Sequence, residues 1–400
     1  MITLNRKQDC CGCTACASIC PKQCISMKED NEGFLYPVTD TSLCVDCNAC
    51  NKVCPIINKQ EECTPLQCYA AKNKDPEVLL KSSSGGVFSV LAEYVLSKGG
   101  VVFGARWEGD KVIHDYVESS AHSELTNRQN YQNLIAPFRG SKYVQSDLRD
   151  TFKLARQFLC EGRIVLFTGT PCEIGGLKAF LKKEYENLIA VDVACHGAPS
   201  PKVLGLYLQE LKMRYMVDTI DVDFRSKITG WKHYSFVASK NGSVLLSELG
   251  RQENIFMRGF LCELYSRPSC HACSFKSFRS QSDLTLADFW GVEKVLPDMD
   301  NRDGISLLTV NSRIGANIID NIGIQLYPVE YKKAVAHNGS LLHSVEPHPK
   351  RDVFFQKITS GNKLSKIIQR TIEPQGLELA QLYFVAAKNK IVNIIKNRIL

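Results

Sequence analysis

The sequence lacks the long apolar segments of a membrane-spanning protein, since no run approaches the ~18 apolar residues that a transmembrane helix needs. Residues 1–7 also lack the apolar stretch of a signal peptide, so we expect a cytoplasmic protein. With 44% hydrophobic and 23% charged residues, the composition excludes disordered, collagen-like and fibrous proteins. A chain of 400 residues, at ~150 residues per domain, predicts two or three globular domains.

Two common nucleotide-binding patterns are also missing from the sequence. No G-x-G-x-x-G follows a predicted strand, and no G-x4-G-K-S/T is present. Their absence excludes the usual dinucleotide and P-loop fingerprints. An unusual nucleotide or flavin site is still compatible with the sequence.

Cysteine, by contrast, is abundant: the chain has 18, and 12 of them lie within the first 68 residues. In a long chain expected in a reducing compartment, free thiols indicate metal binding rather than disulfides. Two runs in this region share the spacing C-x2-C-x2-C-x3-C-P, and the second repeats the first at an offset of 34 residues. This doubled pattern is typical of bacterial ferredoxins with two 4Fe–4S clusters, in which the fourth cysteine of each run binds the other cluster.

The doubled pattern assigns four cysteines to each cluster. Three thiolates within seven residues hold three corners of one cluster, and the proline after each run turns the chain away beyond the exchanged ligand. Structural zinc fits poorly, because zinc sites favour two C-x2-C pairs with a longer spacer. The first cluster is expected at Cys10, Cys13, Cys16 and Cys54, and the second at Cys20, Cys44, Cys47 and Cys50.

Several other cysteines fall outside these runs. Cys63 and Cys68 are placed on the polar linker around residues 58–65 and receive no role. Four more are interpreted as buried packing residues: Cys11, Cys24, Cys160 and Cys262.

The formal net charge of +7, from 49 basic and 42 acidic residues, would by itself allow nucleic-acid binding. A 4Fe–4S cluster with its four thiolates carries about −2, so three clusters would leave roughly +1. We therefore give the charge little weight and expect no nucleic-acid partner.

Beyond residue 66 the pattern is that of a mixed α/β protein. From about residue 152, predicted helices alternate with buried strands at 163–167 and 188–193, and helices between strands imply parallel pairing. Residues 219–248 alternate as antiparallel strands do, and the chain from 348 onward is largely helical in pattern. We divide the chain into a ferredoxin domain, two α/β regions and a helical tail: 1–60, 66–147, 148–330 and 331–400.

Four cysteines of the body are candidates for a further site. Cys172 and Cys195 follow predicted buried strands, where the ligands of α/β sheets bind. Cys270 and Cys273 form a C-x2-C pair further along the chain. Four thiolates suffice for a third 4Fe–4S cluster. From spacing alone, a zinc site or unrelated buried thiols fit about equally well.

Four motifs give the body a family resemblance. They are GSKYVQS at 140–146, GTPCE at 169–173, VDVACHG at 191–197 and ADFWG at 287–291. In this order, and after the ferredoxin runs, they resemble the beta-subunit family of coenzyme F420-reducing hydrogenases and dehydrogenases over roughly residues 5–320. The resemblance implies an iron–sulfur flavoprotein that binds FAD and passes electrons between clusters and a two-electron acceptor. It also implies the third cluster at Cys172, Cys195, Cys270 and Cys273.

The FAD that this resemblance implies directs attention to three loops. The Ser/Gly turn at 82–86 precedes a predicted helix, where it would hold a phosphate on backbone N–H groups or serve only as an ordinary helix cap. The 140–146 motif would line the flavin or form a plain loop. The threonines of the turn before Cys172 would contact a cofactor or only satisfy the hydrogen bonds of the turn. The candidate FAD-binding residues are Ser84, Gly85, Gly86, Lys142, Tyr143, Gln145, Ser146, Thr168 and Thr170.

We assign no residue as a catalytic acid or base. His196 and His271 each adjoin a proposed cluster ligand, and an ordinary satisfied or exposed imidazole explains them better than a proton relay. Phe289 and Trp290 are interpreted as core residues, and Asp288 as either a cofactor contact or a turn cap.

The C-terminal segment 384–400 combines apolar and basic residues and predicts a basic amphipathic helix. Such a helix packs on protein more often than it lies on a membrane surface.

Our main functional hypothesis is an iron–sulfur, flavin-dependent oxidoreductase whose acceptor is coenzyme F420 or a small metabolite. The flavin converts the single electrons of clusters into the two that a hydride acceptor needs, and the flow can run in either direction. A ferredoxin, or a dehydrogenase or hydrogenase subunit, is the expected redox partner. The alternatives are a non-catalytic electron-transfer subunit, a ferredoxin-dependent reductase in cell-surface polysaccharide biosynthesis, and a zinc-bearing binding module.

Overall fold

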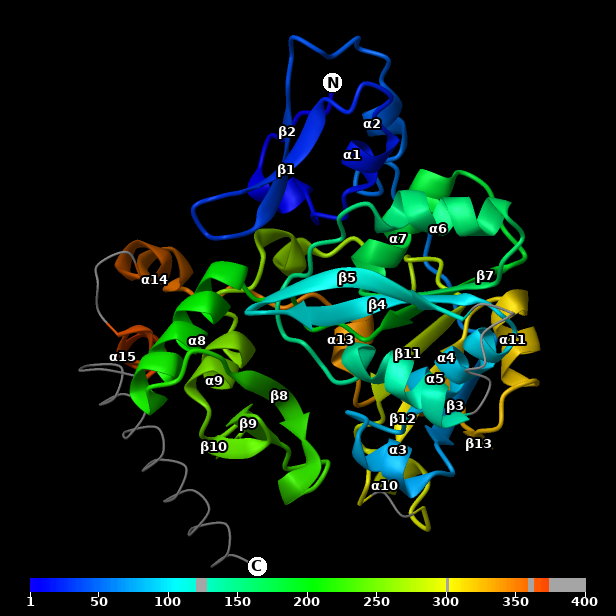
Figure 1. Cartoon of the computed structure of the whole chain (residues 1–400), viewed down its shortest axis with the longest axis vertical. Helices are drawn as coiled ribbons and strands as arrows, with labels where there is room; N and C mark the ends of the chain where they lie inside the picture. The colour runs from blue at the N-terminus through cyan, green and yellow to red at the C-terminus, as the bar shows by residue number, and fades with distance from the viewer. Residues whose placement is uncertain (120–127, 300–301, 359–362, 374–400) are drawn as a thin grey trace, which may run out of the picture.

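The computed structural model describes residues 1–119, 128–299, 302–358 and 363–373. Figure 1 shows a small N-terminal domain at one end of a larger body, in which a long sheet carries helices and a smaller sheet lies to one side. Within these ranges, no helix is long and apolar enough to cross a membrane. The amphipathic helix predicted for 384–400 lies outside the described residues.

The N-terminal domain repeats its backbone conformation at the same 34-residue offset as its sequence. Gly12 and Asp46 both have positive φ angles, and so do Thr14 and Asn48, which precede the two short helices. The elements are η1 (Lys7–Asp9), α1 (Ala15–Ile19), the antiparallel pair β1 (Ile25–Glu29) and β2 (Leu35–Thr39), and α2 (Ala49–Lys52). The two cysteine runs therefore form two similar loops.

An eight-stranded sheet forms the centre of the body, in the order β13-β3-β12-β11-β7-β6-β4-β5. Its middle strands β11, β7, β6 and β4 are parallel, as the alternation of helices and strands predicted, and the outer pairs are antiparallel. The strands are β3 (Gln67–Lys72), β4 (Val101–Glu108), β5 (Lys111–Glu118), β6 (Val165–Gly169), β7 (Leu188–Val193), β11 (Leu284–Asp288), β12 (Ser306–Val310) and β13 (Gln325–Pro328).

A smaller antiparallel sheet, in the order β10-β9-β8, confirms the prediction for residues 219–248. Its strands are β8 (Asp221–Ser226), β9 (Ser235–Lys240) and β10 (Ser243–Leu249). The remaining α-helices are α3 (Pro76–Leu80), α4 (Val87–Ser97), α5 (Arg128–Ile135), α6 (Thr151–Cys160), α7 (Pro171–Leu181), α8 (Pro201–Tyr215), α9 (Ile255–Leu261), α10 (Val292–Val295), α11 (Arg313–Ile319), α12 (Tyr331–Val335), α13 (Gly339–Leu342), α14 (Arg351–Lys357) and α15 (Leu364–Ile372).

Helices cover both faces of the central sheet, because successive side chains of a strand point to opposite faces. Phe103 and Phe167 pack with α6 and α7 on one face. Leu166 and Ile189, from the same parallel strands, pack with α4, α5 and α11 on the other. The near-continuous apolar strands of the centre are thus buried on both sides, as in other parallel sheets.

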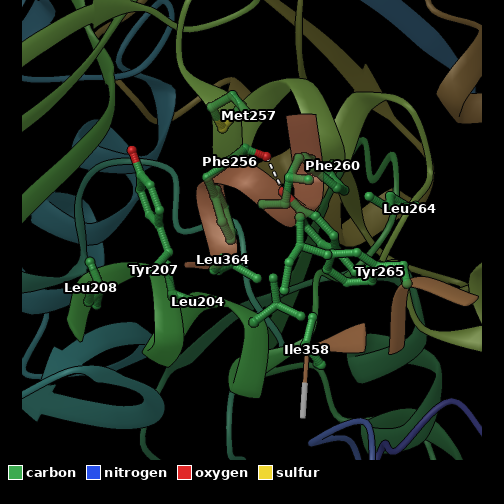
Figure 2. Close-up of a cluster of buried hydrophobic side chains, with 14 of the residues drawn as sticks. Leu204, Tyr207, Leu208, Phe256, Met257, Phe260, Leu264, Tyr265, Ile358 and Leu364 are labelled. Atoms are coloured by element: carbon green, nitrogen blue, oxygen red, sulfur yellow. Dashed lines mark hydrogen bonds between the residues drawn. The ribbon is translucent and has the colours of Figure 1, made fainter. Parts of the chain in front are cut away.

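A separate apolar core joins α8, α9, α14 and α15 (Figure 2). Tyr207 from α8 stacks on Phe256 from α9, and Leu364 from α15 packs against the same cluster. The hydroxyl of Tyr265 donates a hydrogen bond to the carbonyl of Phe256. This core fixes the segment around residues 264–267, which enters the candidate site described below.

The N-terminal domain is docked on this same core through the loop between β1 and β2. Phe34 is fully buried within it. Glu32 forms a buried ion pair with Arg351 of α14, at 2.7 Å, and its carbonyl accepts a hydrogen bond from the hydroxyl of Ser200. A Cβ on Gly33 would lie 2.4 Å from the Cβ of Lys202. The two parts of the chain are therefore closely packed against each other.

The structure corrects three cysteine predictions. Cys68 is not on the linker: it lies on β3, 5% exposed, opposite Thr309 of β12. Cys160 and Cys262 are exposed rather than core residues, because each lies at the C-terminal end of a helix, α6 and α9, where the apolar face has ended. Cys24 is buried as expected, and Cys11 is partly buried.

Candidate iron–sulfur centres and cofactor site

The first set of cysteines, Cys10, Cys13, Cys16 and Cys54, lies together in the structure. Burial and the nearby thiols of Cys10 and Cys54 raise the pKa of Cys16 to about 12. The thiol of Cys13 interacts with those of Cys10 and Cys16. Cys54, which ends the second run, is thus placed with the first run, as the exchanged ligand of a two-cluster ferredoxin requires.

The second set lines a cavity of its own at the outer end of the domain. The walls of the cavity include all four cysteines of this set, Cys20, Cys44, Cys47 and Cys50. It contains about 340 Å³ of empty space, part of it open to solvent, which gives room for a cluster. Cys24 also lines it, with its sulfur 3.3 Å from that of Cys20. Four thiols around such a space fit a 4Fe–4S cluster.

The third set gathers at the carboxyl end of the parallel strands. Cys172 lies in the first turn of α7 after β6, Cys195 follows β7, and Cys270 and Cys273 lie in and directly after η4 (Pro268–Ala272). Burial and the thiols of Cys270, Cys172 and Cys273 raise the pKa of Cys195 well above its usual value. Burial, with Cys172 and Cys273, also raises the pKa of Cys270 to about 12. Four thiols from three loops are therefore close enough to influence one another's pKa, and this donor set fits a third cluster.

The turn that carries the first of these cysteines is held by a buried hydrogen-bonded network. Glu173 accepts bonds from the hydroxyl of Ser146 at 2.6 Å and from the backbone N–H of Thr170 at 2.7 Å. The Nδ1 atom of His114 lies 3.1 Å from the Ser146 hydroxyl, and its Nε2 atom lies 2.8 Å from the carbonyl oxygen of Thr168. Thr170 and Glu173 form the capping box of α7.

The first and third sets are in contact through Cys11 and α7. The nearby Cys13 thiol raises the pKa of Cys11 well above its usual value, and the Cys172 thiol is close enough to lower it in turn. Gly176 of α7 lies so close to Cys13 that a Cβ there would be 2.6 Å from the Cys13 Cβ. A ligand candidate of the first set and one of the third therefore lie near the same thiol, that of Cys11.

Comparison with known proteins separates the same two parts of the chain. Residues 162–330 match the family model for the C-terminal part of the beta subunit of coenzyme F420 hydrogenase/dehydrogenase. Residues 9–56 match the model of the 4Fe-4S dicluster domain. The chain therefore combines a region similar to 4Fe–4S dicluster domains with a region similar to the C-terminal part of these beta subunits. It is thus an iron–sulfur protein of electron transfer related to these beta subunits.

No curated protein matches the chain. Among solved structures, a chain of the xenon-derivatised F420-reducing NiFe hydrogenase complex from Methanosarcina barkeri aligns with a TM-score of 0.43 and 16% identity. The alignment covers 75% of this chain and 94% of that one.

Two of the predicted flavin loops, which precede the matched region in sequence, lie side by side. The Ser141 N–H donates to the hydroxyl of Ser83 at 2.9 Å, which joins the 140–146 motif to the turn at 82–86. Ser84 donates to the carbonyl of Ile305, and the Gly85 N–H donates to Ser306. Gly86 caps α4 with a φ of 77°. Ser84 and Gly85 thus lie at the start of β12, where Ser306 pairs with Asp288 at the carboxyl end of β11.

A basic group next to these loops was not predicted from the sequence. Arg225 of β8 is buried and pairs with Asp288 at 2.8 Å and with the Tyr143 hydroxyl at 3.4 Å. Its guanidinium carbon lies 4.0 Å from the ring centre of Tyr234 and 5.4 Å from that of Trp290. Its Nε and Nη2 atoms are buried without a hydrogen-bond partner among the described residues.

Two lysines extend this basic group. The Lys142 ammonium donates to the carbonyls of Arg139 and Gly140, and burial lowers its pKa to about 7 against the opposing charge of Asp223. Lys227 donates to the carbonyl of Ser84 at 2.8 Å, and burial lowers its pKa to about 8. Arg225 and Lys227 lie in an antiparallel strand and the 3-10 turn after it, so no local pattern marked them.

The other predicted site residues face elsewhere. Gln145 accepts a hydrogen bond from Arg267 at 3.0 Å and one from the Leu35 N–H at 3.3 Å, so its side chain points to the N-terminal domain. His196 pairs with Glu263, and the Nδ1 atom of His271 lies 3.0 Å from the carbonyl oxygen of Val345. The Nε2 atoms of both histidines are nevertheless buried without a hydrogen-bond partner among the described residues, so neither imidazole is fully satisfied as the sequence had suggested.

Proposed function

We propose that the chain is a cytoplasmic iron–sulfur flavoprotein oxidoreductase. It carries single electrons between a partner protein and three clusters in series, and exchanges electron pairs with a two-electron acceptor at FAD. Coenzyme F420 and a small metabolite, such as a sugar precursor of a cell-surface polysaccharide, are the acceptor classes. FAD, when bound, supplies the exchange between one-electron and two-electron chemistry.

The observation that carries this proposal is the contact between the first and third sets of cysteines. Cys11 lies between Cys13 and Cys172, and Gly176 brings α7 against the same loop. A zinc-bearing binding module gains nothing from placing two thiolate sets side by side. A path for electrons from the dicluster domain into the body requires it.

The basic group around Arg225 supports a flavin near the carboxyl end of β11, where Arg225 pairs with Asp288. Two buried guanidinium nitrogens without partners among the described residues favour a ligand that carries negative charge. The rings of Tyr234 and Trp290, with Trp231 stacked on Trp290 at 5.2 Å, provide flat apolar surface next to them. In this arrangement Arg225 and Lys142 bind anionic groups, and the aromatic rings exclude water from them.

The second set of cysteines supports contact with a redox partner at the opposite end. Cys47 is exposed, and the apolar residues Leu43 and Val45 beside it are 55% and 58% exposed. Exposed apolar residues around a cluster provide a small docking surface for an electron carrier. The order of the three sites is therefore second, first and third from the surface inward.

The test is a cofactor inventory of the anoxically purified full chain. About 12 iron, as many acid-labile sulfides and one FAD per chain would support the proposal. About 8 iron and no flavin after reconstitution would remove the oxidoreductase and leave a non-catalytic electron-transfer protein. Zinc without labile sulfide would contradict both interpretations.

A further inference from the structure

Arg267 is a fully buried cation that reaches from the body into the cysteine loop of the N-terminal domain. It is 1% exposed. Its Nε donates to the carbonyl of Cys10 at 3.0 Å, and its Nη2 lies 3.7 Å from the Cys10 sulfur. Further bonds go to Gln145 at 3.0 Å and to the Leu35 carbonyl at 2.9 Å. None of the hydrogen bonds that this guanidinium donates to described residues goes to a carboxylate.

A buried guanidinium needs a negative partner, because an unpaired buried charge is costly. The rings of Tyr36 and Phe34, whose centres lie 4.2 Å and 5.5 Å from the Arg267 Cζ atom, offset only part of the cost of burying this charge. The thiolates of the first set, with a cluster bound, carry a net charge of about −2 next to the guanidinium. The anion that Arg267 faces is therefore the loaded first site itself.

The position of the guanidinium is fixed from both sides. The preceding residues Leu264, Tyr265 and Ser266 are fully buried, and Tyr265 is part of the core in Figure 2. On the opposite side, a Cβ at Gly12 would lie 3.1 Å from the Arg267 Cζ atom. The charge is thus held rigidly against the loop of Cys10.

The main chain of the same residue shapes the third set. Its N–H donates to the Ala198 carbonyl at 2.9 Å, and its carbonyl accepts the Cys270 N–H at 2.9 Å at the start of η4. One residue therefore positions a ligand candidate of the third set with its backbone and contacts one of the first set with its side chain.

We propose that Arg267 is a positioning and tuning residue that raises the reduction potential of the first cluster. Reduction adds one electron from a low-potential donor, without forming or breaking a bond, and makes the site more negative. A fixed positive charge stabilises this reduced state and therefore raises the potential. The electron is then held beside the third set rather than at the exposed second one. The inference rests on the iron–sulfur part of the proposed function and not on its flavin.

The test is a redox titration of the anoxic full chain, followed by electron paramagnetic resonance with dithionite as the reductant. The midpoint of the first cluster is the one lost on Cys16→Ser. In Arg267→Gln we expect this midpoint to fall by a tenfold change in the reduction equilibrium, about 59 mV for one electron. Arg267→Lys keeps the positive charge, so its midpoint should stay close to that of the wild type. Arg149→Gln, which removes an exposed arginine paired with Glu108, should leave it unchanged.

An unchanged midpoint in Arg267→Gln with full iron content would overturn the proposal that the charge of Arg267 raises the potential. A fall in Arg267→Lys as large as that in Arg267→Gln would overturn it as well. If Arg267→Gln fails to load iron, two substitutions of Gln145 test the proposal instead. Gln145→Glu neutralises the guanidinium in place and should lower the midpoint, whereas Gln145→Leu should not. Equal midpoints in these two variants would refute the proposal. A chain with only about 8 iron and no flavin would refute the proposed function, but the midpoint of the first cluster could still be measured in it.

Discussion

Alanine at Gly176 tests whether the contact between the first cysteine loop and α7 is as tight as the structure requires. A Cβ there would lie 2.6 Å from the Cβ and 2.9 Å from the sulfur of Cys13, so the two parts must move apart to reach ordinary contact. Overpacking of this kind costs ~1–3 kcal/mol. Against this, replacing a helical glycine by alanine contributes about 1 kcal/mol of helix stability.

Gly205 in α8 is the matched control, because a Cβ there would have no atom within 4 Å. Gly205→Ala should gain about 0.5–1 kcal/mol, so the two variants should differ by about 1–3 kcal/mol. The assay is the apparent melting temperature of the loaded protein at one fixed scan rate, since loss of clusters makes unfolding irreversible. In anoxic stopped-flow experiments, Gly176→Ala should also slow electron transfer into the third site. Equal melting temperatures for the two variants would refute the tight contact.

Three further predictions concern other parts of the molecule. Arg351→Met leaves Glu32 buried without its partner, which should cost about 3–5 kcal/mol and release the N-terminal domain to limited proteolysis; a proteolysis pattern like that of the wild type would contradict the docking. Cys172→Ser should reduce iron from about 12 to about 8 per chain while the two dicluster signals persist, and loss of all iron would instead indicate misfolding. Because burial lowers the pKa of Lys142 to about 7, the unfolded chain binds the proton more tightly, so stability should rise from about pH 7 to pH 10; Lys142→Met should flatten this rise in melting temperature, and an unchanged slope would show that another group is responsible.

The local chemistry of the chain was readable from its sequence. The cysteine spacing and the strand at 188–193 depend on nearby residues, and the structure has the strand at these bounds. Caps such as Ser200, which accepts a bond from the Val203 N–H, fix helix ends through neighbours in sequence. The parallel centre of the sheet followed from the order of helices and strands.

Residues that act across the fold were not readable in the same way. Arg267 and Cys10 are 257 residues apart, and nothing in the spacing of either indicates that they meet. The same applies to Arg225, which pairs with Asp288 only because β8 lies beside the end of β11. The wrong predictions for Cys160 and Cys262 have a related cause, since apolar neighbours along the chain do not show where a helix leaves the core.

The pairing of Glu32 with Arg351 has a consequence for how the protein is made. The two residues are 319 positions apart, and at ~5–20 residues per second a ribosome needs roughly 15–60 s to travel from one to the other. During that time the N-terminal domain exists without α14, which supplies the partner of Glu32 and completes the surface on which Phe34 is buried. Its cysteine loops are then accessible to the factors that deliver iron and sulfide. Once α14 emerges and the domain docks, the first site is closed between the two halves of the chain.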